Sequence, residues 1–173
     1  MPPSRRQAAR AVVLDEDDRV LLLRARDPFF PAKGEWWELP GGGMEPGEES
    51  GRAALREVHE ETGLSGVEMG PCVWRHDARF TFAGMRFEQL EHIHVARWRK
   101  PAEGAGPYRP GGLEMIEAMA FSGVAWWSAA DLLEMRRSGE RIIPPWLPDQ
   151  LPRFLVEGAP VEPVHLGELG PIF

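Results

Sequence analysis

The sequence is poor in cysteine. Cys72 is the single cysteine among 173 residues, so the chain cannot close an intrachain disulfide and offers no cysteine cluster for zinc. An isolated thiol of this kind usually behaves as a small buried hydrophobic side chain. Disulfide-stabilised domains and zinc fingers are therefore excluded as classes.

Long apolar segments and long basic runs are missing as well. No apolar stretch reaches the length of a membrane-spanning helix, and the N-terminus does not have the pattern of a secretion signal. Basic residues never stand more than two in a row, and the formal net charge is −7. Duplex nucleic acid and membranes are not expected partners, and these features predict a cytoplasmic protein.

The chain does contain enough apolar material for a substantial core. Hydrophobic residues make up 43% of the sequence, which is ordinary for a globular protein, and the length predicts a single domain over residues 1–173. We expect the core of this domain at about 8–137. Seven prolines mark the remainder, about 138–173, as a proline-rich extension with a short helix near 148–157.

Apolar runs bounded by turn residues predict a sheet. Acidic residues join the first two runs in the manner of a hairpin turn, and Ala83 and Gly84 mark a later turn. Residues 101–112 are rich in proline and glycine and predict a loop, and Ser128 is a good N-cap for a late helix. The expected strands are 9–14, 19–25, 36–39, 67–74, 79–83, 86–98 and 123–127.

A helix is expected over residues 49–62. Acidic residues suit its N-terminus, good helix formers fill its middle, and Gly63 follows where a left-handed cap would end it. Leu55 and Val58 stand three residues apart and should face a core.

Three glutamates share one side of this helix. Glu57, Glu60 and Glu61 are spaced by three and four residues, and like charges at such spacings destabilise a helix by a few tenths of a kcal/mol each. Most acidic runs on helices are solvated surfaces. Here a glycine-rich turn precedes the helix, and hard cations such as Mg²⁺ prefer oxygen ligands of this sort. The helix alone leaves the solvated surface and the metal site as equal alternatives.

The spacing of residues around the helix decides between them. A glycine, a glutamate, an Arg-Glu-Val triplet, two adjacent glutamates and a Gly-Leu pair follow one another at fixed intervals. These residues are Gly42, Glu48, Arg56, Glu57, Val58, Glu60, Glu61, Gly63 and Leu64. The pattern resembles the signature box of the Nudix hydrolase superfamily with every defining position filled, a match with a chance of about one in a billion at average composition. The resemblance implies an α+β fold, the Nudix α/β/α sandwich with a mixed central sheet.

The resemblance also implies roles for the acidic residues. Glu57, Glu60 and Glu61 correspond to the carboxylates that bind Mg²⁺ or Mn²⁺, and Glu57 is also the nearest candidate to orient or deprotonate the attacking water. Gly41, directly before the box, corresponds to the residue whose backbone carbonyl completes the coordination. A divalent cation suits phosphoryl chemistry, which depends on positioning and on neutralisation of charge.

Other residues of the box are expected to be structural. Arg56 and Glu48 correspond to a pair that ties the loop to the helix. Gly42 and Gly63 correspond to the glycines that open and close the motif.

Two side chains outside the box are candidates for binding substrate. Arg24 could reach a phosphate, and Trp37 could stack on a base. Because neighbouring strand residues face opposite sides of a sheet, one of Trp36 and Trp37 should pack inside, and the sequence does not say which.

Further candidate ligands lie later in the chain. Many Nudix enzymes bring one more glutamate to the metals from a loop after the box, and Glu114 and Glu117 stand at such a place; we prefer Glu117 as a catalytic residue. His92 and His94 share a strand face, which is more typical of the polar side of an antiparallel strand than of a metal site.

The resemblance implies Mg²⁺-dependent hydrolysis of a nucleoside diphosphate linked to another group, by attack of water on phosphorus. The proline that would mark an ADP-ribose hydrolase is missing at Arg79 and Phe80, and Tyr108, the only tyrosine, is misplaced for a diadenosine polyphosphate marker. A nucleoside triphosphate or a nucleotide sugar remains as the expected substrate. The family often forms dimers, so a homodimer is a further possibility.

Two other functional classes stay open. The domain could bind a nucleotide or metabolite without catalysis, although such domains often lose carboxylates of the box. It could also be an isomerase acting on a prenyl diphosphate, a chemistry that would require Cys72 as a catalytic thiol.

Overall fold

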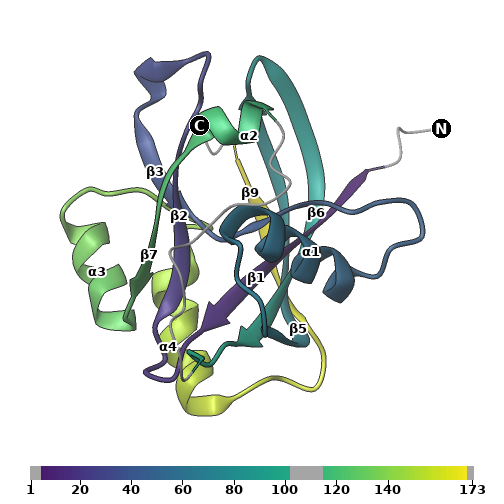
Figure 1. Cartoon of the computed structure of the whole chain (residues 1–173), viewed down its shortest axis with the longest axis vertical. Helices are drawn as coiled ribbons and strands as arrows, with labels where there is room; N and C mark the ends of the chain where they lie inside the picture. The colour runs from purple at the N-terminus through teal and green to yellow at the C-terminus, as the bar shows by residue number, and fades with distance from the viewer. Residues whose placement is uncertain (1–4, 102–114, 171–173) are drawn as a thin grey trace.

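The computed structural model describes residues 5–101 and 115–170. In this part of the chain nine strands form one twisted sheet in the order β8-β3-β2-β1-β6-β5-β9, with β4 paired to β1 and β7 paired to β2 (Figure 1). The strands are β1 (Arg6–Leu14), β2 (Val20–Arg26), β3 (Glu35–Glu38), β4 (Gly41–Gly43), β5 (Glu68–Phe82), β6 (Met85–Arg97), β7 (Phe121–Trp127), β8 (Ile142–Ile143) and β9 (Val164–Leu169). The helices are α1 (Ser50–Thr62), α2 (Met115–Ala120), α3 (Ala129–Arg137) and α4 (Leu147–Glu157).

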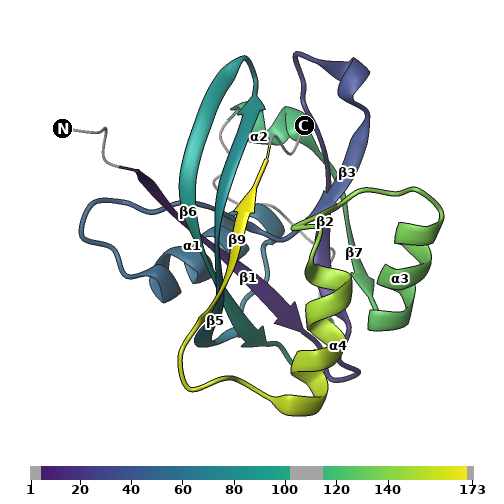
Figure 2. The same ribbon diagram turned by 180° about the vertical axis from the view of Figure 1, so that it is seen from behind.

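Strand β1 separates the core into two layers because successive side chains of a strand point to opposite faces. Ala11 and Val13 pack with apolar residues of α1, while Val12 and Leu14 pack in a second cluster with residues of α3 and α4. Figure 1 shows α1 in front of the sheet, and Figure 2, seen from behind, shows α4 in front. The strand β1 is parallel to β6 and antiparallel to β2 and β4. The predicted α+β fold with a mixed sheet is confirmed.

Most local predictions are confirmed. The hairpin between β1 and β2 turns on Asp15, whose carboxylate accepts hydrogen bonds from the backbone N–H groups of Asp17 and Arg19. The turn at Ala83 and Gly84 is present, with positive φ at both residues. Most of the loop expected at 101–112 lies outside the described residues.

Two predictions are wrong. Residues 67–74 and 79–83 belong to one strand, β5, because the polar stretch between them keeps its pairing with β6 and turns His76 into the interior. Leu55 is 40% exposed, whereas Val58 is fully buried. The small residues Ala53 and Ala54 take the core side of α1 instead, which lets the helix approach the sheet closely.

The proline-rich tail is part of the sheet rather than an appendage. Helix α4 forms as predicted near 148–157, and β8 and β9 add parallel partners to β3 and β5. Leu151 of α4 is fully buried in the cluster that contains Val12. Within the described residues no helix has both the length and the apolar character needed to cross a membrane.

We predict that Leu151→Ala lowers the free energy of unfolding by about 2–5 kcal/mol, because it removes a fully buried side chain from a shared core. Chemical denaturation measures this. Val156→Ala on the same helix is the matched control, since Val156 is 87% exposed and should change stability by no more than about 0.5 kcal/mol. Equal stability of both variants would mean that the tail does not support the core.

Candidate active site

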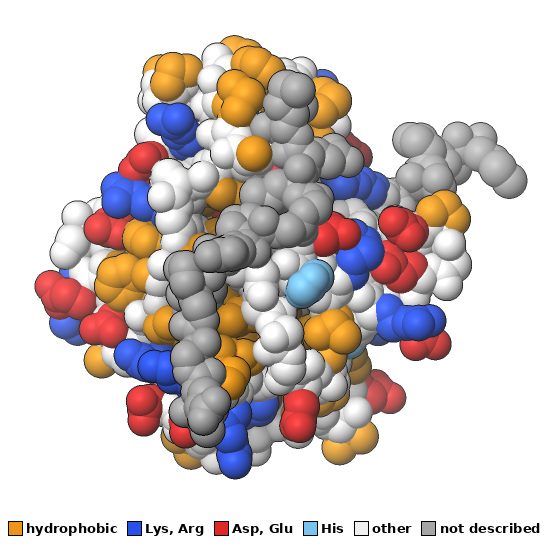
Figure 3. Space-filling model, viewed as in Figure 1, with side chains coloured by type: hydrophobic (Ala, Val, Ile, Leu, Met, Phe, Trp, Pro, Cys, Tyr) orange, Lys and Arg blue, Asp and Glu red, His pale blue; other side chains and the backbone are white. Residues whose placement is uncertain are grey.

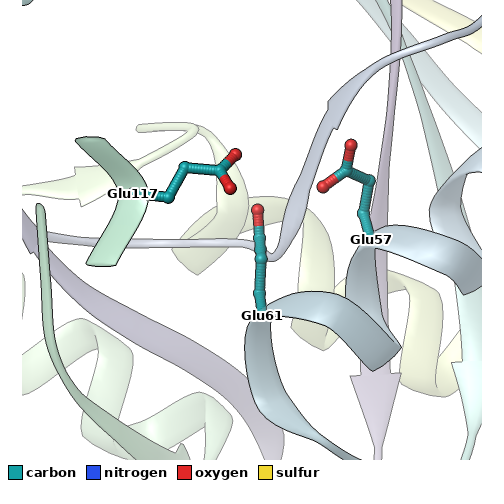
Figure 4. Close-up of side chains that lie close together, drawn as sticks. All are labelled: Glu57, Glu61 and Glu117. Carbon is teal, nitrogen blue, oxygen red and sulfur yellow. The ribbon is translucent and has the colours of Figure 1, made fainter. Parts of the chain in front are cut away.

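Three carboxylates from two helices meet at one point. Glu57 and Glu61 come from successive turns of α1 and Glu117 comes from α2, and their ligand oxygens lie within 4.8 Å of one another. Figure 4 shows the three side chains pointing toward a common space. Glu57 and Glu61 are 6% and 3% exposed. The structure thus brings Glu117 to the box glutamates, while Glu114 lies outside the described residues.

Burial and mutual repulsion make this group of acids electrostatically unfavourable. Burial raises the pKa of Glu61 well above its ordinary value, and the charges of Glu57 and Glu38 raise it further. The pKa of Glu57 is also raised, mainly by burial and against the opposing effect of Arg56. A cation between the carboxylates would relieve both effects. The three clustered ligands are carboxylates only, which fits a hard divalent cation such as Mg²⁺ or Mn²⁺.

The glycine strand β4 lets the backbone approach these acids. A side chain at Gly42 would place its Cβ 2.7 Å from Oε1 of Glu57, so any other residue there would displace this carboxylate from its present position. The N–H of Gly41 donates to Oε2 of Glu61 at 3.1 Å. The predicted role of the Gly41 carbonyl as a metal ligand stays a prediction.

Arg56 joins the loop, the strand and the helix. Its guanidinium binds Glu48 through two nitrogens at 2.9 and 3.0 Å and donates to the carbonyl of Gly43 at 3.1 Å. It also lies 3.1 Å from Glu57 and 3.4 Å from Glu60. Glu60 therefore contacts Arg56 and is not part of the three-carboxylate group in this structure. Helix α1 ends as expected at Gly63, which has φ 72° and caps His59.

The carboxylates open onto an adjacent cavity of about 340 Å³. Five of its lining side chains are aromatic, and we call it the aromatic cavity. The side chains that line it include Trp36, Phe80, Phe82, Met85, Phe87, Phe121, Gln89, two arginines (Arg6 and Arg10) and four acids (Glu38, Glu61, Glu91 and Glu117). Figure 3 shows apolar side chains gathered at the end of the molecule where the β5–β6 turn lies, and Met85 of that turn is 52% exposed.

A buried polar network forms one wall of the cavity. Oε2 of Glu91 accepts hydrogen bonds from Nε of Arg10 at 3.0 Å and from His76 at 2.7 Å, and Oε1 accepts one from Gln89 at 2.6 Å. The indole of Trp146 donates to Nδ1 of His76 at 3.0 Å. Burial alone would raise the pKa of Glu91, but the charge of Arg10 and these hydrogen bonds lower it to about 2. The network links the start of α4 to the active-site wall.

Several predicted residues lie elsewhere. Arg24 pairs with Glu35 at 2.5 Å, and Trp37 stacks edge-on against Trp127 at 5.2 Å. Both belong to the face of β2 and β3 that points away from the aromatic cavity, because Ala25 and Trp36, their neighbours in the chain, line it. Of the tryptophan pair, Trp36 is therefore the cavity residue.

The predicted alternatives for metal and thiol chemistry also lie away from the carboxylates. His94 binds Ser50 and the carbonyl of Gly70, and His92 binds Gln7. Cys72 donates to the carbonyl of Trp74. None of the three lines the aromatic cavity or belongs to the three-carboxylate group in the described part of the chain.

Sequence reasoning missed most of the cavity wall. Arg10 stands inside an otherwise apolar run, and Gln89 and Glu91 alternate along β6. A charged or amide side chain on the buried face of a strand usually has a specific partner or function. The alternation of Gln89 and Glu91 along β6 was the feature of the sequence that could have identified them as residues of the cavity wall.

A family model for the NUDIX domain matches residues 4–149. The chain belongs to the Nudix family. Among curated relatives, a putative 8-oxo-dGTP diphosphatase of Bacillus subtilis is 42% identical over 59 residues, which are 34% of this chain and 36% of that protein. Human diphosphoinositol polyphosphate phosphohydrolase 2 is 48% identical over 52 residues, 30% of this chain and 26% of that protein. The chain thus matches only about a quarter to a third of the length of these relatives.

The fold comparison extends the Nudix likeness beyond the box. An Ap4A hydrolase of C. elegans superimposes with a TM-score of 0.57 over 88% of this chain and 99% of its own, at 18% sequence identity. Such identity shows a shared fold alone.

We predict that Arg56→Ala lowers both stability and activity. The variant leaves Glu48 and the Gly43 carbonyl without their shared donor, which should cost about 2 kcal/mol or more in the free energy of unfolding. Thermal unfolding and hydrolysis assays measure the two effects. Arg52→Ala, an exposed arginine on the same helix, is the control and should match wild type. A wild-type thermal midpoint for Arg56→Ala would contradict the tethering role.

We predict that Glu91 contributes stability that disappears in acid. Its folded pKa of about 2 lies below the ordinary value of 4.5, so the contribution is complete above pH 4.5 and is lost as the pH falls toward 2. Glu91→Gln should be less stable at pH 7 by about 3 kcal/mol, because Arg10 keeps a buried charge. Its stability should also fall less than that of wild type between pH 4.5 and 2. Parallel stability curves for the two proteins would exclude this role.

Proposed function

We propose that the protein is a divalent-metal-dependent hydrolase that cleaves the diphosphate linkage of a nucleoside diphosphate joined to another group, such as a nucleoside triphosphate or a nucleotide sugar. The observation that carries this proposal is the meeting of Glu57, Glu61 and Glu117, of which Glu61 and Glu117 line the aromatic cavity. A ring can enter the apolar part while its diphosphate stays beside the acids.

The residues of the site divide the chemistry among them. Bound Mg²⁺ or Mn²⁺ would neutralise diphosphate oxygens and acidify the attacking water. Glu57, Glu61 and Glu117 would hold the metal, with Glu60 and the carbonyl of Gly41 as further ligands implied by the family pattern. Glu57 would also orient the water, since it lies at the edge of the group beside Arg56. Glu60 would have to leave its 3.4 Å contact with Arg56.

Arg6 is the better candidate for binding the diphosphate than Arg24. Its guanidinium lies 4.9 Å from the ring centroid of Phe87 at the cavity wall and so close to Gly43 that a side chain there would overlap it. Within the described residues Arg6 forms no ion pair. An arginine with its guanidinium beside the carboxylates suits a phosphate, which offers oxygens that those acids cannot bind directly.

The cavity favours a nucleotide over the other substrates of relatives. The human relative is named for a diphosphoinositol polyphosphate, and a ligand with so many phosphates needs many cations. The aromatic cavity offers two arginines against four acids and several aromatic rings. The Bacillus subtilis relative is named for 8-oxo-dGTP, and a nucleotide of that type fits the apolar walls.

The two alternative functions have weaker support. Every carboxylate of the box is present, which argues against a domain that only binds. Cys72 does not line the aromatic cavity, which argues against thiol-dependent isomerisation. A cytoplasmic location and a homodimer remain predictions.

We predict that a panel of nucleoside triphosphates and nucleotide sugars with Mg²⁺ or Mn²⁺ identifies at least one substrate whose diphosphate linkage is broken. Glu60→Gln and Glu61→Gln should each lower kcat/KM by about 100-fold, because each removes a negative charge from the metal ligands. Glu68→Gln, an exposed glutamate outside the site, serves as the control. Product analysis by phosphorus NMR gives the bond that breaks.

Hydrolysis that persists unchanged in Glu61→Gln, or that does not require a divalent cation, would refute the proposed mechanism. Loss in Glu61→Gln with normal turnover in Glu60→Gln would limit the ligands to the three clustered carboxylates.

A further inference from the structure

A side chain that lines the aromatic cavity has an amide oxygen with no partner among the described residues. Gln89 is 2% exposed, and its buried Oε1 accepts no hydrogen bond from residues 5–101 or 115–170. A buried acceptor of this kind costs about 1–3 kcal/mol unless something donates to it. Natural proteins keep few such atoms, and each one calls for a physical reason.

The hydrogen-bond network around Glu91 starts at the indole of Trp146, which can only donate a hydrogen bond. The indole nitrogen of Trp146 is a donor without acceptor capacity, so Nδ1 of His76, 3.0 Å away, must be the acceptor. The proton of His76 then resides on Nε2, which lies 2.7 Å from Oε2 of Glu91 and donates to it. This assignment of the tautomer follows from the network.

Glu91 in turn fixes the direction of Gln89. Arg10 donates to the same carboxylate at 3.0 Å, and the lowered pKa of Glu91 keeps it ionised at neutral pH. An ionised carboxylate only accepts, so the amide group 2.6 Å from its Oε1 must be the NH₂ of Gln89. Rotating the amide group of Gln89 by half a turn would place its oxygen against Oε1 of Glu91, and both of these atoms are acceptors. The amide oxygen of Gln89 therefore remains an acceptor on the side of the amide group that faces away from Glu91.

The surroundings of this acceptor suit a flat ring. Phe80 and Phe87 are stacked at 5.0 Å with 16° between their planes, and both line the cavity with Gln89. Trp36, which also lines the cavity, is held by a 2.6 Å hydrogen bond from its Nε1 to Glu38. Aromatic walls bind planar rings through stacking, worth about 1–3 kcal/mol per base. A ring that also carries an N–H group would supply the missing donor.

We propose that the aromatic cavity holds the nucleobase of the substrate and that Oε1 of Gln89 accepts a hydrogen bond from an N–H group on the edge of that base. Gln89 is then a specificity-determining residue. The inference rests on the proposed function, since it names the part of the nucleotide that the cavity recognises. It assigns the selectivity to an oxygen whose direction is set by Glu91, in a network that ends three hydrogen bonds away at Trp146.

The first experiment compares two ligands on the wild-type protein. The best substrate of the nucleotide panel is paired with an analogue whose base-edge N–H groups are deleted or methylated. The analogue leaves the oxygen of Gln89 buried and unpaired, so kcat/KM should fall by about 10-fold to 100-fold, mostly through KM. Equal KM values for the two ligands would overturn the proposal without any variant.

The second experiment removes the acceptor. Gln89→Met keeps a side chain of similar length and volume without the amide, and it should process the two ligands with equal kcat/KM, at about the level of the analogue on wild type. Gln7→Met is the matched control, because Gln7 is exposed on β1 and binds His92 outside the cavity. The control should keep the wild-type ratio. Retention of that ratio by Gln89→Met would overturn the proposal.

A binding measurement separates this inference from the proposed function. Calorimetry with the nucleoside 5′-monophosphate and the same base analogue, without metal, gives the comparison without turnover. Failure of every nucleotide to be hydrolysed would refute the proposed function, and a 10-fold or greater difference in Kd between the two monophosphates would still support the inference. Equal Kd values would overturn it.

Discussion

The buried ion pair of Arg10 and Glu91 is the interaction on which the rest of the structure depends. Two charges in a core lose most of their hydration, and they stay there only when every remaining hydrogen-bonding position is filled. Here β1 supplies the arginine, β6 the glutamate and β5 the histidine that donates to it. The pair therefore fixes three strands relative to one another and forms one polar wall of the aromatic cavity.

The group of three carboxylates shows the opposite arrangement of charge. Glu57 and Glu61 are buried with like charges close by, and the protein leaves their repulsion only partly compensated by Arg56 and Arg10. Glycines in β4 remove the side chains that would keep the acids apart. The ion pair of Arg10 and Glu91 thus lies beside three carboxylates whose negative charge is only partly compensated. A ligand with a flat ring and a diphosphate can interact with both parts of the proposed site.

How well a part of the structure is predicted from the sequence depends on how far apart in the chain its interacting residues lie. Helix α1, its Gly63 cap and the capping box of Ser128 depend on neighbours within a few residues, and the sequence predicts them. The pairing of β8 with β3 and of β9 with β5 joins residues about a hundred positions apart, where local pattern carries no information. Gly41 and Glu117 were placed near the site by family likeness. The sequence left open which of Trp36 and Trp37 packs inside, and the structure sets Trp36 beside Glu38 on the cavity side. A substrate contact at Trp37 stays a prediction.

The position of β9 has a consequence for how the chain matures. This strand covers the edge of β5, a strand of fifteen residues that would otherwise present a long row of free N–H and carbonyl groups. During synthesis on the ribosome that row stays open until β9 has emerged, and β9 follows every other described element in the chain. The nascent chain therefore passes through an interval in which the other described strands can already pair while the edge of β5 is still open to pairing with a neighbouring copy of the chain.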